Sequence, residues 1–181
     1  MEAAAPARNE AGLLARFAAG DLDAFETIFR EHQAEVFGWI LRIVRQRALA
    51  EDATIETFWR IYRARAHFDA TRGFGAWARR IATNAAIDAL KGAVREVAGP
   101  ADPPAAPAPG SDPGLERAVR AAFRQLPAKL QAAASLALIE ELPSADIARA
   151  LGISVPAVKS RVFRAVGLLR KKLRRLGIES A

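Results

Sequence analysis

Cysteine is absent from this chain of 181 residues. Its absence excludes a disulfide framework and any metal site built on thiolates, and it fits a reducing cytoplasm. The two histidines, His32 and His67, lie far apart and neither stands at ligand spacing from a carboxylate cluster, so we expect no metal site. The sequence also has no glycine-rich phosphate loop and no nucleophile elbow. We therefore expect neither a cofactor nor an enzyme.

Long apolar runs are missing as well. No run approaches the roughly 20 residues that a membrane span needs. The first residues, Met-Glu-Ala-Ala-Ala-Pro-Ala-Arg, lack the basic start and apolar centre of a signal peptide. We expect no membrane insertion and a cytoplasmic protein. Because 51% of the residues are hydrophobic, the chain can form one large or two small domains.

Acidic residues are scarce in only one half of the chain. Residues 1–96 carry 14 Lys/Arg and 13 Asp/Glu, whereas residues 97–181 carry 13 and 7. The excess of positive charge is therefore +1 in the first part and +6 in the second. Such a concentration predicts a polyanionic partner, of which nucleic acid is the most common.

Helical spacing of apolar residues predicts an all-α fold with two small domains. In the first domain, residues 10–96, we expect helices over 10–19, from Asp21 or Asp23 onward for more than 20 residues, over 49–66 and over 74–96. Residues 97–114 hold six of the ten prolines and form a Pro/Ala-rich linker. At roughly 3.1 Å per residue this linker could reach about 50 Å, so the two domains can sit on separate surfaces. The second domain, residues 115–176, has expected helices over 115–126, 128–140, 144–151 and 154–176.

The last two of these helices form a predicted helix-turn-helix. Ser144 and Ser154 can cap the two helices, and Gly152 between them supplies a left-handed turn. Ala148, Gly152 and Val158 have the spacing that lets two helices cross closely. The final helix then carries eight Lys/Arg between residues 159 and 175 and no acid.

That basic helix favours DNA binding over its alternative, a solvated terminal helix. A solvated helix normally interleaves acids that pair with its cations at i,i+4. Four further cations lie several turns on, and for them a solvated or nonspecific role is at least as good an interpretation: Lys171, Lys172, Arg174 and Arg175.

The two halves together resemble bacterial sigma factors of the extracytoplasmic-function (ECF) group in the sigma-70 family. The matching motifs are Asp23-Ala-Phe25, Ala50-Glu-Asp-Ala53, Glu56-Thr-Phe58 and Phe74–Lys91 in the first half, and Leu126-Pro127, Asp146-Ile-Ala148 and Val158–Ala165 in the second. One departure is Ile55, where the family usually has glutamine. It removes a polar side chain from the surface expected to contact the polymerase.

The resemblance implies a function for each domain. Residues 10–96 would bind core RNA polymerase and would recognise and melt the −10 element, and residues 115–176 would read the −35 element of promoter DNA. An anti-sigma factor is a further implied partner. The implied polymerase contacts are Asp52, Glu56, Thr57, Phe58 and Trp59, and those at −10 are Phe68, Arg80, Asn84 and Asp88. At −35, the side chains expected to reach bases are Lys159, Ser160 and Phe163, and those expected to bind phosphates are Arg161 and Arg164.

Several of these residues have structural alternatives. Phe58 and Trp59 are adjacent and point about 100° apart on a helix, so one of them should lie at an interface. Asn84 is a poor helix former in mid-helix, and a local hydrogen bond to Asp88 or to the backbone would also explain it. The resemblance implies that the 67–75 loop forms a pocket for an extruded base, with core packing an even alternative for Phe74.

Two other function classes compete with a sigma factor. One is a helix-turn-helix regulator that binds DNA without recruiting polymerase, its first domain serving dimerisation or sensing. The other is a protein-interaction module such as a sigma decoy.

Overall fold

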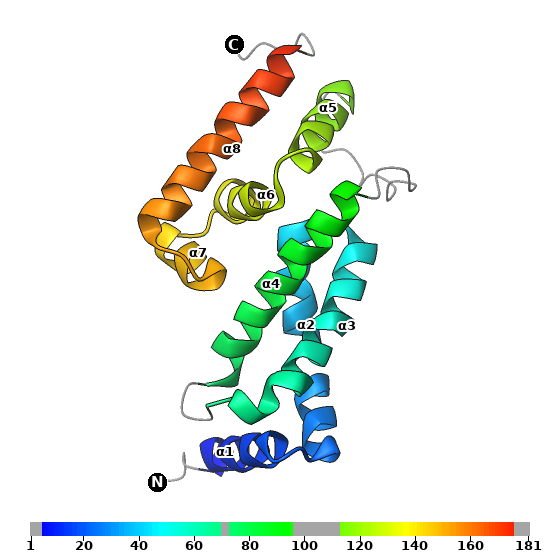
Figure 1. Cartoon of the computed structure of the whole chain (residues 1–181), viewed down its shortest axis with the longest axis vertical. Coiled ribbons are helices and arrows are strands. Elements are labelled where there is room, and N and C mark those ends of the chain that lie inside the picture. Colours follow the sequence, from blue (N-terminus) through cyan, green and yellow to red (C-terminus); the bar gives the residue numbers. More distant parts are fainter. Residues whose placement is uncertain (1–4, 70–72, 96–112, 176–181) are drawn as a thin grey trace.

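The structure is a computed structural model that describes residues 5–69, 73–95 and 113–175. Every element in these ranges is helical, which confirms the all-α prediction (Figure 1). The elements of the first half are α1 (Ala5–Ala18), α2 (Leu22–Val44), α3 (Arg47–Ala64), the 3-10 turn η1 (Arg65–His67) and α4 (Phe74–Arg95). Those of the second half are α5 (Pro113–Arg124), α6 (Ala128–Ala134), the π-helical segment η3 (Ser135–Ile139), α7 (Ser144–Leu151) and α8 (Val155–Arg175).

Helices α2, α3 and α4 form the first bundle, and α1 crosses one end of it (Figure 1). Of the two predicted candidates, Asp21 caps α2, because its carboxylate accepts hydrogen bonds from the backbone N–H groups of Asp23 (2.9 Å) and Ala24 (3.1 Å). The apolar stripe of α2 then faces α3 and α4, and Ile28 and Ile40 are fully buried. The apolar spacing along α2 thus places this helix in the core.

An aromatic cluster closes the lower end of this bundle. It brings together Phe17 of α1, Phe68 after η1, and Phe74 and Trp77 of α4. The ring centroids of Phe17 and Phe74 are 6.2 Å apart, and those of Phe68 and Trp77 are 4.7 Å apart. Such edge and tilted contacts add to the free energy of burial, so the cluster fixes α1 and the start of α4 against each other.

In the second bundle, α5 and α6 pack against α8. Leu126, Leu130 and Ala165 are buried there, with Leu169 of α8 packed beside them. The helix predicted over 128–140 is one continuous helical stretch whose last part, η3, is π-helical. A π segment shifts the side chains that follow it around the helix axis, which apolar spacing alone does not reveal.

Helices α7 and α8 form the predicted helix-turn-helix. Gly152 ends α7 in the left-handed conformation, with φ 61°. The Ser154 hydroxyl accepts a hydrogen bond from the Ala157 N–H at 3.4 Å, so Ser154 caps α8 as predicted. The prediction that Ser144 caps α7 is wrong, because Pro143 occupies the cap position and Ser144 is already helical.

The two bundles pack against each other. Leu136 and Ile147 of the second bundle belong to the same buried cluster as Ile43 of the first, and the Ser135 hydroxyl donates a hydrogen bond to the Ile43 carbonyl at 3.3 Å. In Figure 1, α6 lies beside the upper part of α4, α7 lies beside its middle, and α8 lies on their far side. The sequence predicted only a linker long enough to let the domains separate.

Ion pairs reinforce this contact at its edge. Glu140, after η3, pairs with Arg45 at 3.2 Å and with Arg42 at 3.4 Å. Both arginines belong to the C-terminal end of α2, where Arg45 adopts a left-handed conformation with φ 59°. We call the arrangement held by these contacts the closed form.

Among the residues placed in the structure, no helix is both long and apolar enough to cross a membrane. Within the same ranges, no three acidic or histidine side chains come together in a way that could hold a metal ion.

Candidate nucleic-acid and protein interfaces

The exposed face of α8 carries most of the side chains predicted to bind the −35 element. Val158 and Ala165 are buried against the second bundle, and this fixes which side of α8 faces solvent. Phe163 is 81% exposed, so its ring has almost no partner in the described fold. Lys159, Ser160 and Arg164 are exposed beside it, and Arg161 is half-buried. An aromatic ring that is this exposed among cations is available for an intermolecular contact.

On α4, Arg80, Asn84 and Asp88 lie along one exposed stripe, as their spacing predicts. The Asn84 carboxamide makes no hydrogen bond to any described residue, so the local bond that could have explained it is not observed there. Its two donors and its carbonyl oxygen are directed to solvent and can serve an external partner.

Asp88 is tied to two cations. Its carboxylate accepts hydrogen bonds from Lys91 at 2.7 Å and from Arg60 of α3 at 3.0 Å. The bond from Lys91 is the main cause that lowers the Asp88 pKa; partial burial opposes it and the bond from Arg60 adds to it. Asp88 therefore stays ionised at neutral pH and holds both cations on this face.

Phe68 does not lie on the surface. Its side chain is only 8% exposed and packs within the aromatic cluster against Phe17, Phe74 and Trp77. The prediction that Phe68 stacks on an unpaired base is therefore wrong for this structure, because the ring faces are already covered. Phe74 is buried as well, which decides the alternatives for that residue in favour of core packing.

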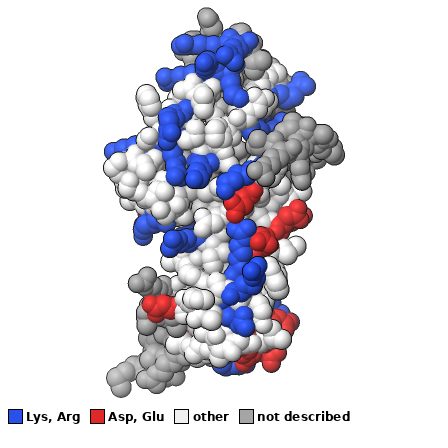
Figure 2. Space-filling model, viewed as in Figure 1, with Lys and Arg blue, Asp and Glu red and all other residues white. Residues whose placement is uncertain are grey.

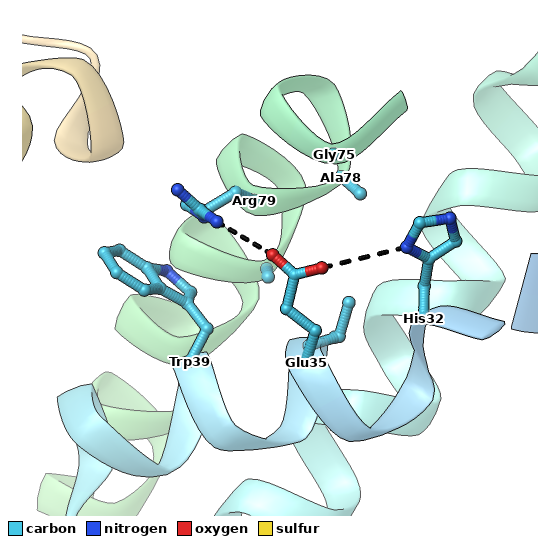
Figure 3. Close-up of a pocket in the computed structure, with 8 residues that line it drawn as sticks. His32, Glu35, Trp39, Gly75, Ala78 and Arg79 are labelled. Atoms are coloured by element: carbon cyan, nitrogen blue, oxygen red, sulfur yellow. Dashed lines mark hydrogen bonds and ion pairs between the residues drawn. The ribbon is translucent and has the colours of Figure 1, made fainter. Parts of the chain in front are cut away.

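The described residues enclose a small cavity near the start of α4 (Figure 3). Glu35 of α2 points between Arg79 of α4, at 2.8 Å, and His32 of its own helix, at 3.8 Å. The Arg79 guanidinium also lies 5.1 Å from the centre of the Trp39 ring. The volume of about 10 Å³ suits one water and not a base. Part of the loop predicted to form a base pocket, residues 70–72, lies outside the described residues.

Helix α3 presents a mixed acidic and apolar surface. Its acidic residues Asp52 and Glu56 are exposed. Two apolar side chains are exposed beside them, Ile55 by 70% and Trp59 by 55%. The Trp59 ring stacks on Tyr62 at 6.2 Å, which fixes its orientation. We call Asp52, Ile55, Glu56 and Trp59 the α3 surface.

Two of the predicted polymerase contacts are not part of this surface. Thr57 is fully buried, and its hydroxyl donates a hydrogen bond to the Ala53 carbonyl at 2.6 Å. Phe58 is buried against Phe29, with ring centroids 4.6 Å apart. Both predictions need correction, because these side chains point into the first bundle. The prediction that Phe58 or Trp59 lies at an interface is narrowed to Trp59.

Ile55 also belongs to the α3 surface, although it was not among the expected polymerase contacts. The signal was present in the sequence, since an isoleucine at a position where the family usually has glutamine adds apolar surface next to Trp59. Exposed apolar side chains at i and i+4 lie side by side on a helix.

Comparison with known proteins shows which family regions the two bundles match. Residues 28–96 match the model of sigma-70 region 2, and residues 116–169 match the model of sigma-70 region 4. The chain is 36% identical to the RNA polymerase sigma factor CarQ of Myxococcus xanthus, over 92% of this chain and 98% of that one. It is 31% identical to the ECF RNA polymerase sigma factor SigM of Mycobacterium tuberculosis, over 92% of this chain and 85% of that one.

A solved structure shares the fold. The chain of CnrH, determined in complex with the cytosolic domain of CnrY, superposes with a TM-score of 0.55 at 24% identity, over 92% of this chain and 97% of that one.

Proposed function

This chain belongs to the ECF group of the sigma-70 family, and we propose that it binds core RNA polymerase through the α3 surface and directs initiation at promoters read by α4 and α8. Members of this family are initiation factors and not enzymes, so the chain contributes binding energy that holds promoter DNA open. The observation that carries the proposal is the presence of both family regions, in order, on one chain of matching length.

At the −35 element, α8 enters the major groove with its N-terminal turns. Lys159, Ser160 and Phe163 face the bases, where direct readout takes place. Arg161 and Arg164 bind the phosphates on either side, which gives affinity and register and little sequence information.

At the −10 element, the exposed stripe of α4 contacts the unpaired strand. The free carboxamide of Asn84 can hydrogen-bond a base edge, and Arg80 beside it supplies positive charge. Asp88 remains on this face as the anchor of Arg60 and Lys91. Phe68 has no place in the proposal, because it belongs to the core.

Replacing Asn84 by alanine should impair promoter opening and leave the affinity for −35 duplex unchanged. Alanine is a better helix former than asparagine, so α4 should be stabilised by a few tenths of a kcal/mol. Opening is measured by permanganate reactivity of thymines at −10, and we expect a drop of up to about tenfold in its rate, the size of one lost hydrogen bond to a base. Thr27→Ala, a change at an exposed site on α2, is the control. Unchanged opening would exclude a −10 contact by Asn84.

Simultaneous contact with both elements requires the closed form to open. Elements near −10 and −35 are about 25 base pairs apart, which is roughly 85 Å at 3.4 Å per base pair. In the closed form, α4 contacts α7, and each of α4 and α8 is only about 33 Å long at 1.5 Å per residue. The residues between α4 and α5 are enough in number for the bundles to separate.

Replacing Glu140 by glutamine should favour the open form, because it removes the charge that pairs with Arg42 and Arg45. Partly exposed pairs contribute up to about 1 kcal/mol, so the opening constant should rise about fivefold. The chain has no cysteine, so dyes can be attached at Glu31→Cys on α2 and Arg124→Cys on α5, and their energy transfer reports the separation. Glu141→Gln, at an exposed residue with no ion pair among the described ones, is the control. Equal energy transfer in both variants would contradict a role for the Glu140 pairs.

The alternative function, a helix-turn-helix regulator without polymerase, predicts DNA binding alone. Co-elution of the chain with core polymerase from the same bacterium on size exclusion separates the two, since only a sigma factor should form that complex.

We further propose an anti-sigma partner and a cytoplasmic location. The similar chain CnrH is described in complex with the cytosolic domain of CnrY, and bacterial RNA polymerase, on which the related sigma factors act, is cytoplasmic.

A further inference from the structure

The last turns of α8 carry a cluster of cations that the −35 contacts do not use. Arg170, Lys171, Arg174 and Arg175 are all exposed, and together with Gly167 they form one open surface on α8. We call these four cations the C-terminal patch. In Figure 2, Lys and Arg gather over this upper end of the molecule, and no acidic side chain is visible among them.

These four cations have no acidic partner in the described part of the chain. Elsewhere exposed arginines are regularly neutralised: Arg30 by Glu26, Arg47 by Glu51 and Arg79 by Glu35. The four cations of the C-terminal patch thus stand close together on one helix with no described acid beside them.

The helix dipole explains only part of this cluster. Cations in the last turn, such as Arg174 and Arg175, are stabilised by the C-terminal end of a helix. Arg170 and Lys171 lie one turn earlier, and each repels the cation four residues further on, which costs a few tenths of a kcal/mol for each pair. A polyanion bound along the helix would offset this repulsion.

The rest of α8 holds the patch in a defined direction. Leu169 packs against the cluster of Leu126 and Leu130, so the opposite face of α8 is turned to solvent. The Lys172 ammonium donates a hydrogen bond to the Gln125 side-chain oxygen at 2.7 Å and ties this part of α8 to α5. The patch is therefore presented by a helix that is fixed on two sides.

The patch continues the exposed stripe of the −35 contacts. From Phe163 and Arg164 the stripe passes Gly167 and reaches Lys171 and Arg174 at steps of three or four residues. Arg174 lies about 15 Å beyond Arg164 along the axis, at 1.5 Å per residue. The major groove is about 12 Å wide. A helix whose first turns read bases in that groove therefore has its last turns above the bordering sugar-phosphate backbone.

We propose that the C-terminal patch is a second DNA contact, which binds the phosphates flanking the −35 element. This inference rests on the proposed −35 role of α8 and adds a DNA contact beyond residues 159–164. The patch binds duplex backbone without reading sequence, and Gly167, which has no side chain and no neighbouring atom within 4 Å of a Cβ position, leaves room for the strand to approach.

The test compares the full chain with the triple variant Arg170→Gln, Lys171→Gln, Arg174→Gln. The probe is a duplex selected by the unaltered chain from random sequences, and its affinity is measured from 50 to 200 mM salt. Each lost phosphate contact lowers the salt slope by about 0.9, so the triple variant should lose about 2.7 units, a change of roughly 40-fold in the affinity ratio over that range. The preference for the selected duplex over a scrambled one should stay the same.

The matched control removes three charges from the first bundle, with Arg30→Gln, Arg47→Gln and Arg63→Gln. Its slope should equal that of the unaltered chain, and circular dichroism of both variants should show unchanged helix content. A triple variant with the slope of the control would overturn the inference. So would a triple variant that loses its preference for the selected duplex, or one that binds DNA normally and loses core polymerase. If the unaltered chain selects no sequence, it is the proposed −35 function that fails.

Discussion

Replacing Trp59 by alanine should weaken binding to core RNA polymerase by about 30- to 1000-fold, the range of an interface hot spot worth 2–4 kcal/mol. Trp59 supplies the aromatic ring of the α3 surface. It is flanked by the exposed side chain of Ile55 and by the carboxylate of Glu56. An apolar centre with charges at its rim is the arrangement that gives tight and specific protein contacts. The fold should not suffer, because more than half of the side chain is already in water.

Fluorescence anisotropy of the labelled chain, titrated with core polymerase in the absence of DNA, measures this affinity. Phe163→Ala removes an even more exposed aromatic ring from α8 and should leave the affinity for polymerase unchanged. If Trp59→Ala binds polymerase as tightly as the unaltered chain, the α3 surface is not the polymerase interface.

Replacing Phe68 by alanine should lower the free energy of unfolding of the first bundle by about 3 kcal/mol, the lower end of the usual cost of removing a buried phenylalanine. The ring contacts Phe17, Phe74 and Trp77, which belong to two different helices, so its loss leaves a cavity at their junction. Urea unfolding followed by tryptophan fluorescence gives this free energy. Leu22→Ala, at an exposed site, should change it by less than about 0.5 kcal/mol. Normal stability together with impaired promoter opening would restore Phe68 as a stacking residue.

The helices could be predicted because their signals are local. Apolar spacing, the carboxylate of Asp21 and the glycine at 152 act within a few residues, and they place α4 within one residue of its observed end and α7 at its observed bounds. At the start of α7 two residues compete for the cap position, and the predicted cap, Ser144, lies one residue after the observed cap, Pro143.

Burial was harder to predict because it depends on residues far apart in the chain. The pattern around Phe58 and Trp59 required one of them to face solvent, and contact with Phe29 of α2 decides that Phe58 faces the core. Phe68 is covered by Phe17, about fifty residues earlier, and no local pattern connects the two.

The closed form is the clearest case of this limit. Glu140 and Arg45 are 95 residues apart in the chain. The residues around each of them therefore give no sign that the two side chains form an ion pair. The exposed side of α8, by contrast, could be predicted from helical spacing, and of the five expected −35 contacts only Arg161 is half-buried.

Transcription by core polymerase from the same bacterium, with and without this chain, tests the central claim most directly. The template is a library of genomic fragments, and the start sites of the transcripts are mapped. We predict that adding the chain produces transcripts that start at a small set of defined sites preceded by shared −10 and −35 sequences, and that Trp59→Ala abolishes them. The same random background of starts with and without the chain would contradict its function as a sigma factor.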